Sequence, residues 1–456
     1  MLWLLLRKTF RSFIFPPLDL CVKLLHYRFS ISQLLRFYKY ITEFWLIFVD
    51  LYAFIWYYIR NKQLRSIAMN TFLITDYGVK RDVSDIQTEA LQSVFDLCKK
   101  SGGTVVIPAG RFYTGGLYIH SNTTLLLKEG ACLCGSDDCN DYEVFPFPSG
   151  LEVRSDMEMI TQYYKNNPWE TYRRAIISSY GEKNISIIGE KNSFIDGQNC
   201  YDPDGEERYR GPHAIYLTCC KNVLLEGYTA QHSGNFLHEA NNCRNLTMRR
   251  VTCLGGSDGI HLHCSEDTLI EDCLFKTGDD CIAGININRL TVRRCILNTS
   301  CNIFRMGGIH IHVEDCHSYG PGYYPHRKTI VKGKNDYLPR TEGRHNTLML
   351  VEYFASTNYP YEASRDIVFK NCLFENLKGV LRYLADHGTL QSGTHLSEIS
   401  FENVRFENIS ECSVIEASKE EPLTIKMKNV TFTPDDAENM SCIFAPHAPN
   451  TEIIEY

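Results

Sequence analysis

Alternating apolar and polar positions form a short phrase that recurs through the middle of the chain. The phrase occupies residues 245–251, 267–273, 289–295 and 309–316. Its last positions, spaced 22, 22 and 21 residues apart, are Val251, Cys273, Cys295 and Cys316. Alternation with a period of two is typical of a half-buried strand. A fixed repeat of about 20–25 residues indicates a solenoid of stacked strands.

Weaker copies of the phrase extend the repeat in both directions, at residues 221–228, 366–372, 398–404 and 423–430. Leucine-rich repeats share this period, but their leucine and asparagine framework is absent from the chain. We therefore predict an all-β fold, a right-handed single-stranded parallel β-helix whose coils bury one continuous core.

One amphipathic helix is predicted before the repeats, over residues 84–100. Ser84 is the expected N-cap, and Gly102 and Gly103 the expected end. Its apolar stripe would comprise Ile86, Ala90, Leu91, Val94 and Leu97. We expect this helix to cover the open end of the solenoid. Strands are predicted directly after it, over residues 103–108 and 123–127.

Charge is distributed unevenly and divides the chain into two parts. Residues 1–68 carry 10 Lys and Arg against 3 Asp and Glu, a net charge of +7; the total of −7 therefore leaves −14 on the remainder. We assign residues 1–68 to an apolar, basic N-terminal segment and residues 69–456 to the β-helix domain. The acidic domain argues against nucleic acid as a partner.

The N-terminal segment has three interpretations. Residues 44–59 form an apolar run of 16 residues interrupted by Asp50, short of the ~20 that a membrane span needs. The segment is therefore a membrane anchor, an interfacial helix, or the product of a start codon assigned too early. We favour the last, with Met69 as the start. Membrane association is expected only through residues 1–68.

The 19 cysteines bear on the cellular compartment. Cys273, Cys295, Cys316 and Cys372 share one repeat position, so we expect them to stack unpaired in the core. That arrangement fits a reducing compartment and a cytoplasmic protein, with membrane association through residues 1–68 as the alternative. Two close pairs, Cys132 with Cys134 and Cys219 with Cys220, lack the spacing of a zinc site.

Two acidic motifs lie one repeat apart. Asp258 precedes Asp279 by 21 residues and Asp280 by 22. Residues one coil apart stack at about 4.8 Å, so the three carboxylates become neighbours.

Adjacent Asp279 and Asp280 can reach the same site only at a strand end or bulge, which Gly278 would permit. Paired carboxylates are the requirement for glycosidic bond hydrolysis. Capping carboxylates in a turn, or a calcium site, are the alternatives.

Basic side chains offer candidate contacts for an acidic sugar. Cys316 and Cys372 are 56 residues apart rather than about 22, so a long insertion is predicted between them. Residues 327–344 contain six Lys or Arg against two Asp or Glu. We select Arg327 and Lys332 from this patch, with a solvated loop as the alternative. Arg305, about one coil after the acidic motif, is a third candidate for binding a substrate carboxylate.

From residue 69 to about residue 430 the chain resembles glycoside hydrolase family 28, the polygalacturonase family. The resemblance rests on residues 74–79 (Ile-Thr-Asp-Tyr-Gly-Val), 102–108 (Gly-Gly-Thr-Val-Val-Ile-Pro), 194–197 (Phe-Ile-Asp-Gly) and the acidic motifs. Ser257-Asp258 stands for the family's Asn-Thr-Asp, and residues 278–281 match Gly-Asp-Asp-Cys. The family's Gly-His-Gly is missing, since residues 298–305 contain no histidine. Its Arg-x-Lys has no clear match.

The resemblance implies an inverting hydrolase acting on pectic or related uronic-acid-containing poly- or oligosaccharides. Asp280 would be the general acid, and Asp258 and Asp279 would activate the attacking water. No cofactor and no metal are expected. A polysaccharide lyase and a non-catalytic carbohydrate-binding β-helix are the rival functions. His261 and His263 lie beside the acidic site in sequence, and no role is assigned to them.

Overall fold

The computed structural model describes residues 70–153, 169–206, 209–326, 345–355, 362–384, 394–433 and 448–456. The chain divides into two units between Met69 and Asn70, and the described residues belong to the second. The interpretations of residues 1–68 therefore lie outside the described residues and stay predictions. Within the described ranges, no helix is long and apolar enough to span a membrane.

Strands account for most of the described chain and form two sheets. The larger sheet comprises β1 (Thr71–Leu73), β2 (Gly103–Ile107), β4 (Leu117–Tyr118), β5 (Thr123–Leu127), β7 (Ala175–Tyr180), β8 (Lys183–Gly189), β11 (His213–Thr218), β12 (Lys221–Glu226), β14 (His238–Asn241), β15 (Arg244–Arg249), β17 (Ile260–His263), β18 (Glu266–Glu271), β20 (Ile282–Arg293), β22 (Phe304–Glu314), β24 (Met349–Tyr353), β25 (Arg365–Lys370), β27 (Gly379–Leu384), β28 (Glu398–Glu402), β30 (Val414–Glu416), β31 (Leu423–Lys428) and β33 (Thr451–Glu455). The smaller sheet comprises β3 (Gly110–Thr114), β6 (Ala131–Gly135), β9 (Phe194–Asp196), β13 (Thr229–Gln231), β16 (Thr252–Gly255), β19 (Leu274–Thr277), β21 (Ile296–Thr299), β23 (His317–Tyr319), β26 (Leu373–Glu375), β29 (Arg405–Glu407) and β32 (Thr431–Thr433).

The remaining elements are short. They are strand β10 (Tyr201–Glu206), the α-helices α4 (Thr88–Ser101) and α6 (Trp169–Tyr172), and the 3-10 helices η1 (Ile74–Tyr77) and η2 (Cys139–Asp141).

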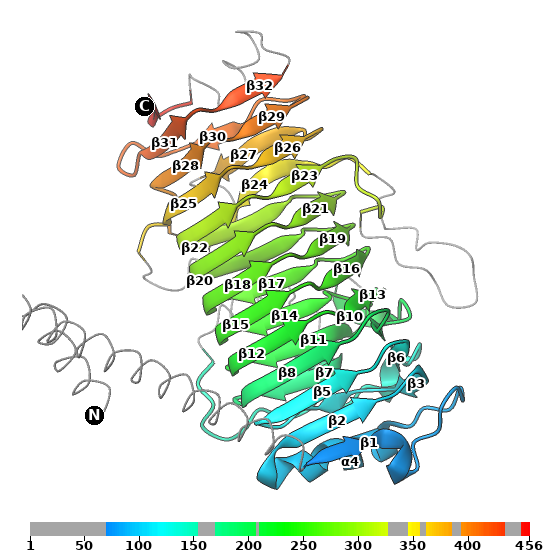
Figure 1. Cartoon of the computed structure of the whole chain (residues 1–456). Coiled ribbons are helices and arrows are strands. Elements are labelled where there is room, and N and C mark those ends of the chain that lie inside the picture. Colours follow the sequence, from blue (N-terminus) through cyan, green and yellow to red (C-terminus); the bar gives the residue numbers. More distant parts are fainter. Residues whose placement is uncertain are drawn as a thin grey trace, which may run out of the picture. The chain divides into compact units, whose positions relative to one another are not determined.

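Every pairing between strands of these sheets is parallel, and the partners are one coil apart. Within the larger sheet, β12, β15 and β18 pair in one series, while β11, β14 and β17 pair in a second. The smaller sheet supplies the third face of each coil, as in the series β13, β16, β19. Successive coils follow one another along the chain in Figure 1. The predicted parallel β-helix is therefore confirmed.

The sequence repeat coincides with the strand register. Thr247 pairs with Leu269, Leu269 with Thr291, and Thr291 with His312. The spacings of 22, 22 and 21 residues are therefore one coil each, as predicted. The predicted insertion begins after β23, because β22 pairs next with β24 and β25. Strands β2 and β5 confirm the two predictions made for the N-terminal end.

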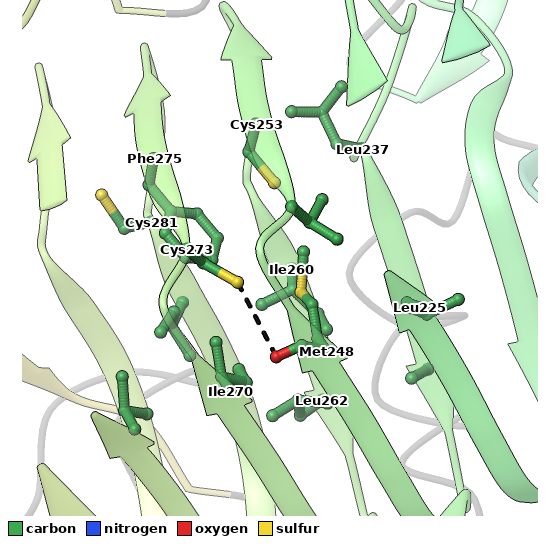
Figure 2. Close-up of a cluster of buried hydrophobic side chains, with 14 of the residues drawn as sticks. Leu225, Leu237, Met248, Cys253, Ile260, Leu262, Ile270, Cys273, Phe275 and Cys281 are labelled. Carbon is green, nitrogen blue, oxygen red and sulfur yellow. Dashed lines mark hydrogen bonds between the residues drawn. The ribbon is translucent and has the colours of Figure 1, made fainter. Parts of the chain in front are cut away.

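Inward-facing side chains of equivalent coils stack on one another to form the core. Met248, Ile270 and Val292 occupy one such column and are fully buried. Figure 2 shows this part of the core, in which the Cys273 thiol donates to the Met248 carbonyl at 3.7 Å. Each coil buries its apolar face only against its neighbours, so the core is continuous along the solenoid.

The stacked cysteines are buried and unpaired, as predicted. Cys273, Cys295, Cys316 and Cys372 are all free thiols with at most 4% of their surface exposed. Cys412, outside this column, is disulfide-bonded. That disulfide weighs against a uniformly reduced protein, so the cysteines give weaker support to a reducing compartment than the stacked set alone suggests.

The predicted N-terminal helix forms, but it starts later than the sequence suggested. Helix α4 begins at Thr88 after Gln87, so the prediction of Ser84 as N-cap was wrong. The Gln87 side chain is held to both backbone groups of Lys80, at 2.7 and 2.9 Å, and its own N–H bonds Tyr113 O. These bonds keep the chain before Thr88 against the first coil and out of the helix.

The buried face of α4 also differs from the predicted stripe. Its buried residues are Leu91, Val94, Phe95 and Cys98. Ile86, before the helix, and Leu97 are each 40% exposed. The buried positions follow the i, i+3, i+4, i+7 pattern of one helical face, and that face joins the core. The helix therefore covers the first coil, as expected.

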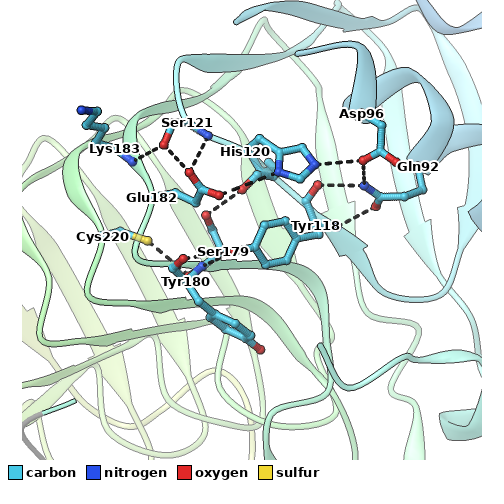
Figure 3. A network of polar contacts seen from close by, with 11 residues as sticks. Gln92, Asp96, Tyr118, His120, Ser121, Ser179, Tyr180, Glu182, Lys183 and Cys220 are labelled. Carbon is cyan, nitrogen blue, oxygen red and sulfur yellow. Dashed lines mark hydrogen bonds and ion pairs between the residues drawn. The ribbon is translucent and has the colours of Figure 1, made fainter. Parts of the chain in front are cut away.

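Polar contacts fix α4 to the first coils (Figure 3). Gln92 bonds both backbone groups of Tyr118, accepting from its N–H at 2.8 Å and donating to its carbonyl at 3.1 Å. The side chain thus pairs the end of β4 as a neighbouring strand would. His120 lies between Asp96, at 2.9 Å, and Glu182, at 3.8 Å. Glu182, together with Asp96, raises the pKa of His120 against the opposing effect of burial.

A ladder of asparagine side chains runs along one turn of the N-terminal coils. Asn184 donates to Asn122, Asn222 to Asn184, and Asn245 to Asn222, each at 2.8 Å between amide nitrogen and oxygen. All four residues are left-handed, with φ between 56° and 59°. Asparagine adopts this conformation more readily than other residues with a side chain. One residue type therefore satisfies both the turn and the contact between coils.

Substitution at Asn222 tests the ladder. Asn222→Ala removes two amide hydrogen bonds and puts alanine, which adopts left-handed backbone less readily than asparagine, at a position with φ 56°, so we expect it to cost about 2 kcal/mol in the free energy of unfolding. Asn222→Gly is the matched control, because glycine tolerates positive φ and loses only the hydrogen bonds. Urea denaturation should rank wild type above the glycine variant and the glycine variant above alanine. Equal midpoints for all three proteins would contradict the role of the ladder.

Candidate active site

Three carboxylates meet where two neighbouring coils enter the larger sheet. Asp258 lies two residues before β17, and Asp280 lies two residues before β20. Ile260 pairs with Ile282, and Gly259 N–H donates to Asp280 O at 3.0 Å, so the two positions are equivalent. Oxygens of Asp258, Asp279 and Asp280 all lie within 4.8 Å of one another. The structure thus brings together the residues that the spacing predicts to be neighbours.

The bend between β19 and β20 lets Asp279 and Asp280 reach the same site. Both residues precede the first residue of β20, at a strand end as the sequence analysis required. Thr277 Oγ1 donates to the carbonyl of Asp279 at 2.8 Å, and Thr299 Oγ1 donates to the same oxygen. At Gly278 a β-carbon would lie 2.3 Å from Pro325 O. The insertion passes so close to the backbone at position 278 that only glycine, which has no β-carbon, fits there.

Asp279 is held by a buried ion pair. Its Oδ2 lies 3.0 Å from Arg210 Nη2, and each side chain is only 3% exposed. Arg210 also donates to Asn235 Oδ1 at 2.9 Å, and its guanidinium lies over the Phe236 ring at 5.2 Å. His326 Nε2 lies 3.5 Å from the other oxygen of Asp279. An adjacent guanidinium favours the ionised form of a carboxyl group, so the ion pair with Arg210 favours the carboxylate form of Asp279.

Asp280 has the opposite environment. Its Oδ1 accepts from the Asn302 side-chain amide at 2.9 Å and from the Asn302 backbone N–H at 3.2 Å. Burial, and then the neighbouring Asp279 charge, raise the pKa of Asp280 to about 7, while Arg305 opposes the rise. Asn302 also donates to Glu352 Oε2 at 3.0 Å. Asp280 is therefore a carboxylic acid that can keep its proton near neutral pH.

The three predicted substrate-binding residues have different outcomes. Arg305 is partly buried beside the carboxylates, with its guanidinium 4.2 Å above the centre of the Phe354 ring. Burial disfavours its charge, but Asp280 and Glu352 outweigh that effect and raise its pKa. Arg305 thus adds a positive charge beside the carboxylates, and its role in substrate binding stays a prediction. Arg327 and Lys332, with the rest of the basic patch, lie outside the described residues.

Several residues of this site were not selected from the sequence. Arg210 lies 69 residues before Asp279, and His326 comes from the insertion. Neither belongs to the repeated phrase, so no periodicity pointed to them. Asn302 did have a signal, because it follows Asp280 by the same 22 residues that separate Asp258 from Asp280.

The spacing of the carboxylates bears on their chemistry. A water that hydrogen-bonds two oxygens at about 2.8 Å each can bridge a gap of 4.8 Å. An inverting pair of carboxyl groups is ordinarily about 6.5–9.5 Å apart. Here the nearest oxygens are closer than that range. The arrangement accommodates a bridging water, while the stereochemical outcome stays a prediction.

The same carboxylates were also interpreted as a cation site. Their nearest oxygens are close enough to share an ion. However, Arg210 already places a guanidinium 3.0 Å from Asp279, and the raised pKa of Asp280 favours its neutral form. Both features oppose binding of a dication by these three groups. The arrangement suits acid–base chemistry better.

The parallel β-helix carries three carboxyl groups at the entry of two neighbouring strands. Residues 147–302 match the family model described as Glycosyl hydrolases family 28. The matched segment contains Asp258, Asp279, Asp280 and Arg210. The resemblance to glycoside hydrolase family 28 that the sequence motifs indicated is therefore confirmed.

Relatives and solved structures agree with this match. The chain is 25% identical over 246 residues to an exo-poly-alpha-D-galacturonosidase of Dickeya chrysanthemi, covering 46% of this chain and 41% of the relative. It is 26% identical over 220 residues to a probable polygalacturonase of Vitis vinifera, covering 46% and 43%. The chain thus matches less than half the length of either protein. The exopolygalacturonase of Thermotoga maritima shares the fold, with a TM-score of 0.60, 15% identity, and coverage of 80% of this chain and 87% of that one.

Proposed function

We propose that this protein is a glycoside hydrolase that cleaves pectic or related uronic-acid-containing poly- or oligosaccharides. The observation that carries the proposal is the contrast between two adjacent carboxyl groups. Asp279 is paired with Arg210 at 3.0 Å, whereas burial and the Asp279 charge raise the pKa of Asp280 to about 7. Two carboxyl groups whose environments separate their protonation states supply the acid and the base of glycosidic hydrolysis.

The proposed reaction assigns one task to each carboxyl group. Asp280 gives its proton to the oxygen of the leaving sugar as the glycosidic bond breaks. Asp258 and Asp279 hold the attacking water between them and accept its proton. Asn302, whose side-chain amide donates a hydrogen bond to Asp280 Oδ1, orients the acid toward the leaving oxygen. Arg305 supplies the positive charge for the uronate carboxylate beside the scissile bond.

The proposal includes inversion at the anomeric carbon, which the family resemblance implies. Attack by a water held on one side and protonation by Asp280 on the other would replace the leaving group directly. Because the nearest oxygens of the three carboxyl groups lie within 4.8 Å of one another, a retaining mechanism is the alternative. In that mechanism one carboxylate attacks the sugar and the configuration at the anomeric carbon is retained. The configuration of the first product distinguishes the two.

Proton NMR of the full chain digesting a panel of pectic and related uronate oligosaccharides tests the proposal. We expect the first-formed product to carry the anomer opposite to that of the cleaved bond. Product with the original anomer would keep the hydrolase but overturn inversion. The panel should include neutral oligosaccharides as the matched control, because Arg305 predicts a preference for substrates that bear a carboxylate.

A polysaccharide lyase is the second enzyme to consider, since it would act on the same uronates. Lyases require a base that removes a proton beside the uronate carboxylate. Arg210 is buried and already paired with Asp279, so it is unsuited to that task. An unsaturated, ultraviolet-absorbing product would nevertheless establish the lyase and overturn the hydrolase. Binding of uronates without any turnover would favour a carbohydrate-binding β-helix.

A further inference from the structure

A second polar cluster lies next to the carboxylates and has no part in the proposed hydrolysis. It consists of Glu239 on β14 with His261 and His263 on β17. Glu239 pairs with His261 across the two strands, and His263 is two residues further on the same face. The three residues are 1%, 5% and 6% exposed. A carboxylate and two imidazoles from two adjacent coils are thus buried together.

Several polar atoms of this cluster have no hydrogen-bond partner within the described part of the chain. They are both carboxylate oxygens of Glu239, Nδ1 of His261 and Nε2 of His263. Burying such groups unpaired is costly, and a carboxylate most of all. This arrangement therefore lowers the stability of the folded protein unless a ligand binds the cluster.

The distances within the cluster are slightly longer than those between the ligands of a bound metal ion. Glu239 Oε2 lies 3.6 Å from His261 Nδ1, and Glu239 Oε1 lies 3.8 Å from His263 Nδ1. Both separations are too long for hydrogen bonds. Ligand atoms about 2.0–2.1 Å from a tetrahedral zinc ion are about 3.4 Å apart. One ligand atom from each residue can be chosen so that all three lie within 4.8 Å of one another. Small side-chain adjustments would bring the set to the spacing of a bound ion.

The surroundings orient the ligands before any ion binds. The His261 ring stacks on Phe236, with centroids 4.6 Å apart and an angle of 30°, and contacts the His263 ring edge-on at 4.4 Å. Its other nitrogen, Nε2, lies 3.6 Å from Asp258 Oδ2. An imidazole that faces a ligand site with one nitrogen and a carboxylate with the other is the usual arrangement in metal centres.

We propose that Glu239, His261 and His263 bind a divalent transition-metal ion, with zinc as the best fit. Two imidazoles and one carboxylate leave a coordination position open, as in catalytic zinc sites. Asp258 Oδ2, 3.6 Å from His261 Nε2, is a neighbouring carboxylate that favours a cation, whereas the charges of Arg210 and Arg305 near His261 oppose one. The bound ion would hold His261 in the orientation that places Nε2 against Asp258. It would thus be a positioning group for the proposed water-activating carboxylate.

Cobalt(II) titration of the chelator-treated full chain tests the metal site, because tetrahedral cobalt absorbs visible light. We expect one Co²⁺ per chain, displaced by Zn²⁺. Glu239→Gln and His263→Ala should each weaken binding by at least about tenfold. Asp280→Asn, in the neighbouring carboxylate cluster, is the matched control and should bind as the wild type does. Circular dichroism of each variant separates lost ligands from lost fold.

Two results would overturn the proposal. One is a wild-type protein that takes up no cobalt, which would leave water as the occupant of the cluster. The other is binding that survives both ligand variants. In that case a thiolate charge-transfer band that disappears in Cys301→Ser would assign the ion to Asp279, Cys301 and His326 instead. Binding is measured without turnover, so failure of the metal site and failure of the proposed hydrolase can be told apart.

Discussion

Asp280→Asn is expected to lower kcat/KM by at least about 10²–10⁴-fold, the usual contribution of a general acid. The amide is nearly the same size as the carboxyl group and can still accept from Asn302, but it has no acidic proton to give. Assays with the uronate substrate identified by NMR measure the effect. A variant that retains wild-type turnover would remove Asp280 from the mechanism.

The pH profile provides an independent check on the same residue. The acid must be protonated in the free enzyme, so kcat/KM of the wild type should fall as pH rises through about 7. A sugar with a good leaving group needs less protonation, and its cleavage should decline less steeply over the same range. A rate that rises through pH 7 would contradict the assignment of Asp280 as acid.

Asp280→Asn should also stabilise the protein at alkaline pH. Burial and the Asp279 charge raise the pKa of Asp280 above its value in the unfolded chain. The folded state therefore holds this proton more tightly, and the resulting stability is complete below the unfolded pKa and is lost as pH rises through about 7. Urea midpoints of the variant should exceed those of the wild type at pH 8 and approach them at pH 4. A variant less stable than wild type at pH 8 would count against the buried, raised-pKa acid.

Arg210→Met is expected to have the second-largest effect. It leaves the Asp279 carboxylate buried beside Asp280 without its guanidinium, which typically costs about 3–5 kcal/mol in the free energy of unfolding. Turnover should fall as well, because Asp279 would lose the charge that keeps it ionised. Denaturant unfolding and kcat/KM measure the two losses separately.

The double variant Arg210→Met/Asp279→Asn identifies the cause of that loss. Removing both charges leaves no unpaired ion, so much of the stability lost in Arg210→Met should return while activity stays low. Arg210→Lys, which keeps the charge but not the planar fork, should fall between wild type and Arg210→Met. Additive stability losses in the double variant would show that the two side chains do not act as a pair.

The fold could be predicted from the sequence because each coil repeats the same physical requirement. Column positions such as Met248 and Ile270 must be apolar in every coil, and a period of 22 residues makes them visible. The start of α4 could not be predicted in this way. It depends on hydrogen bonds from Gln87 to Lys80 and Tyr113, contacts that exist only once the first coil has formed.

The residues of the candidate site also divide into those that the repeat predicts and those that it does not. One column of equivalent positions contains Asp258, Asp280 and Asn302, and it can be recognised in the sequence from their spacing of 22 residues. Glu239 and His261 share the next column at the same spacing. Arg210 and His326 come from connections whose lengths vary between coils. Their positions are set by how those connections fold back on the sheet, and no local pattern in the sequence records that.

The amide at Asn302 limits the positions along the solenoid at which a sugar chain could be cleaved. Asp258 and Asp280 face each other on adjacent coils, whereas one coil further on Asp280 faces Asn302, which cannot take up a proton from water. If hydrolysis proceeds as proposed, a chain displaced by one coil meets an unproductive pair. Under that mechanism, the position at which the sugar chain stops relative to Asp258 and Asp280 would decide which bond is cleaved.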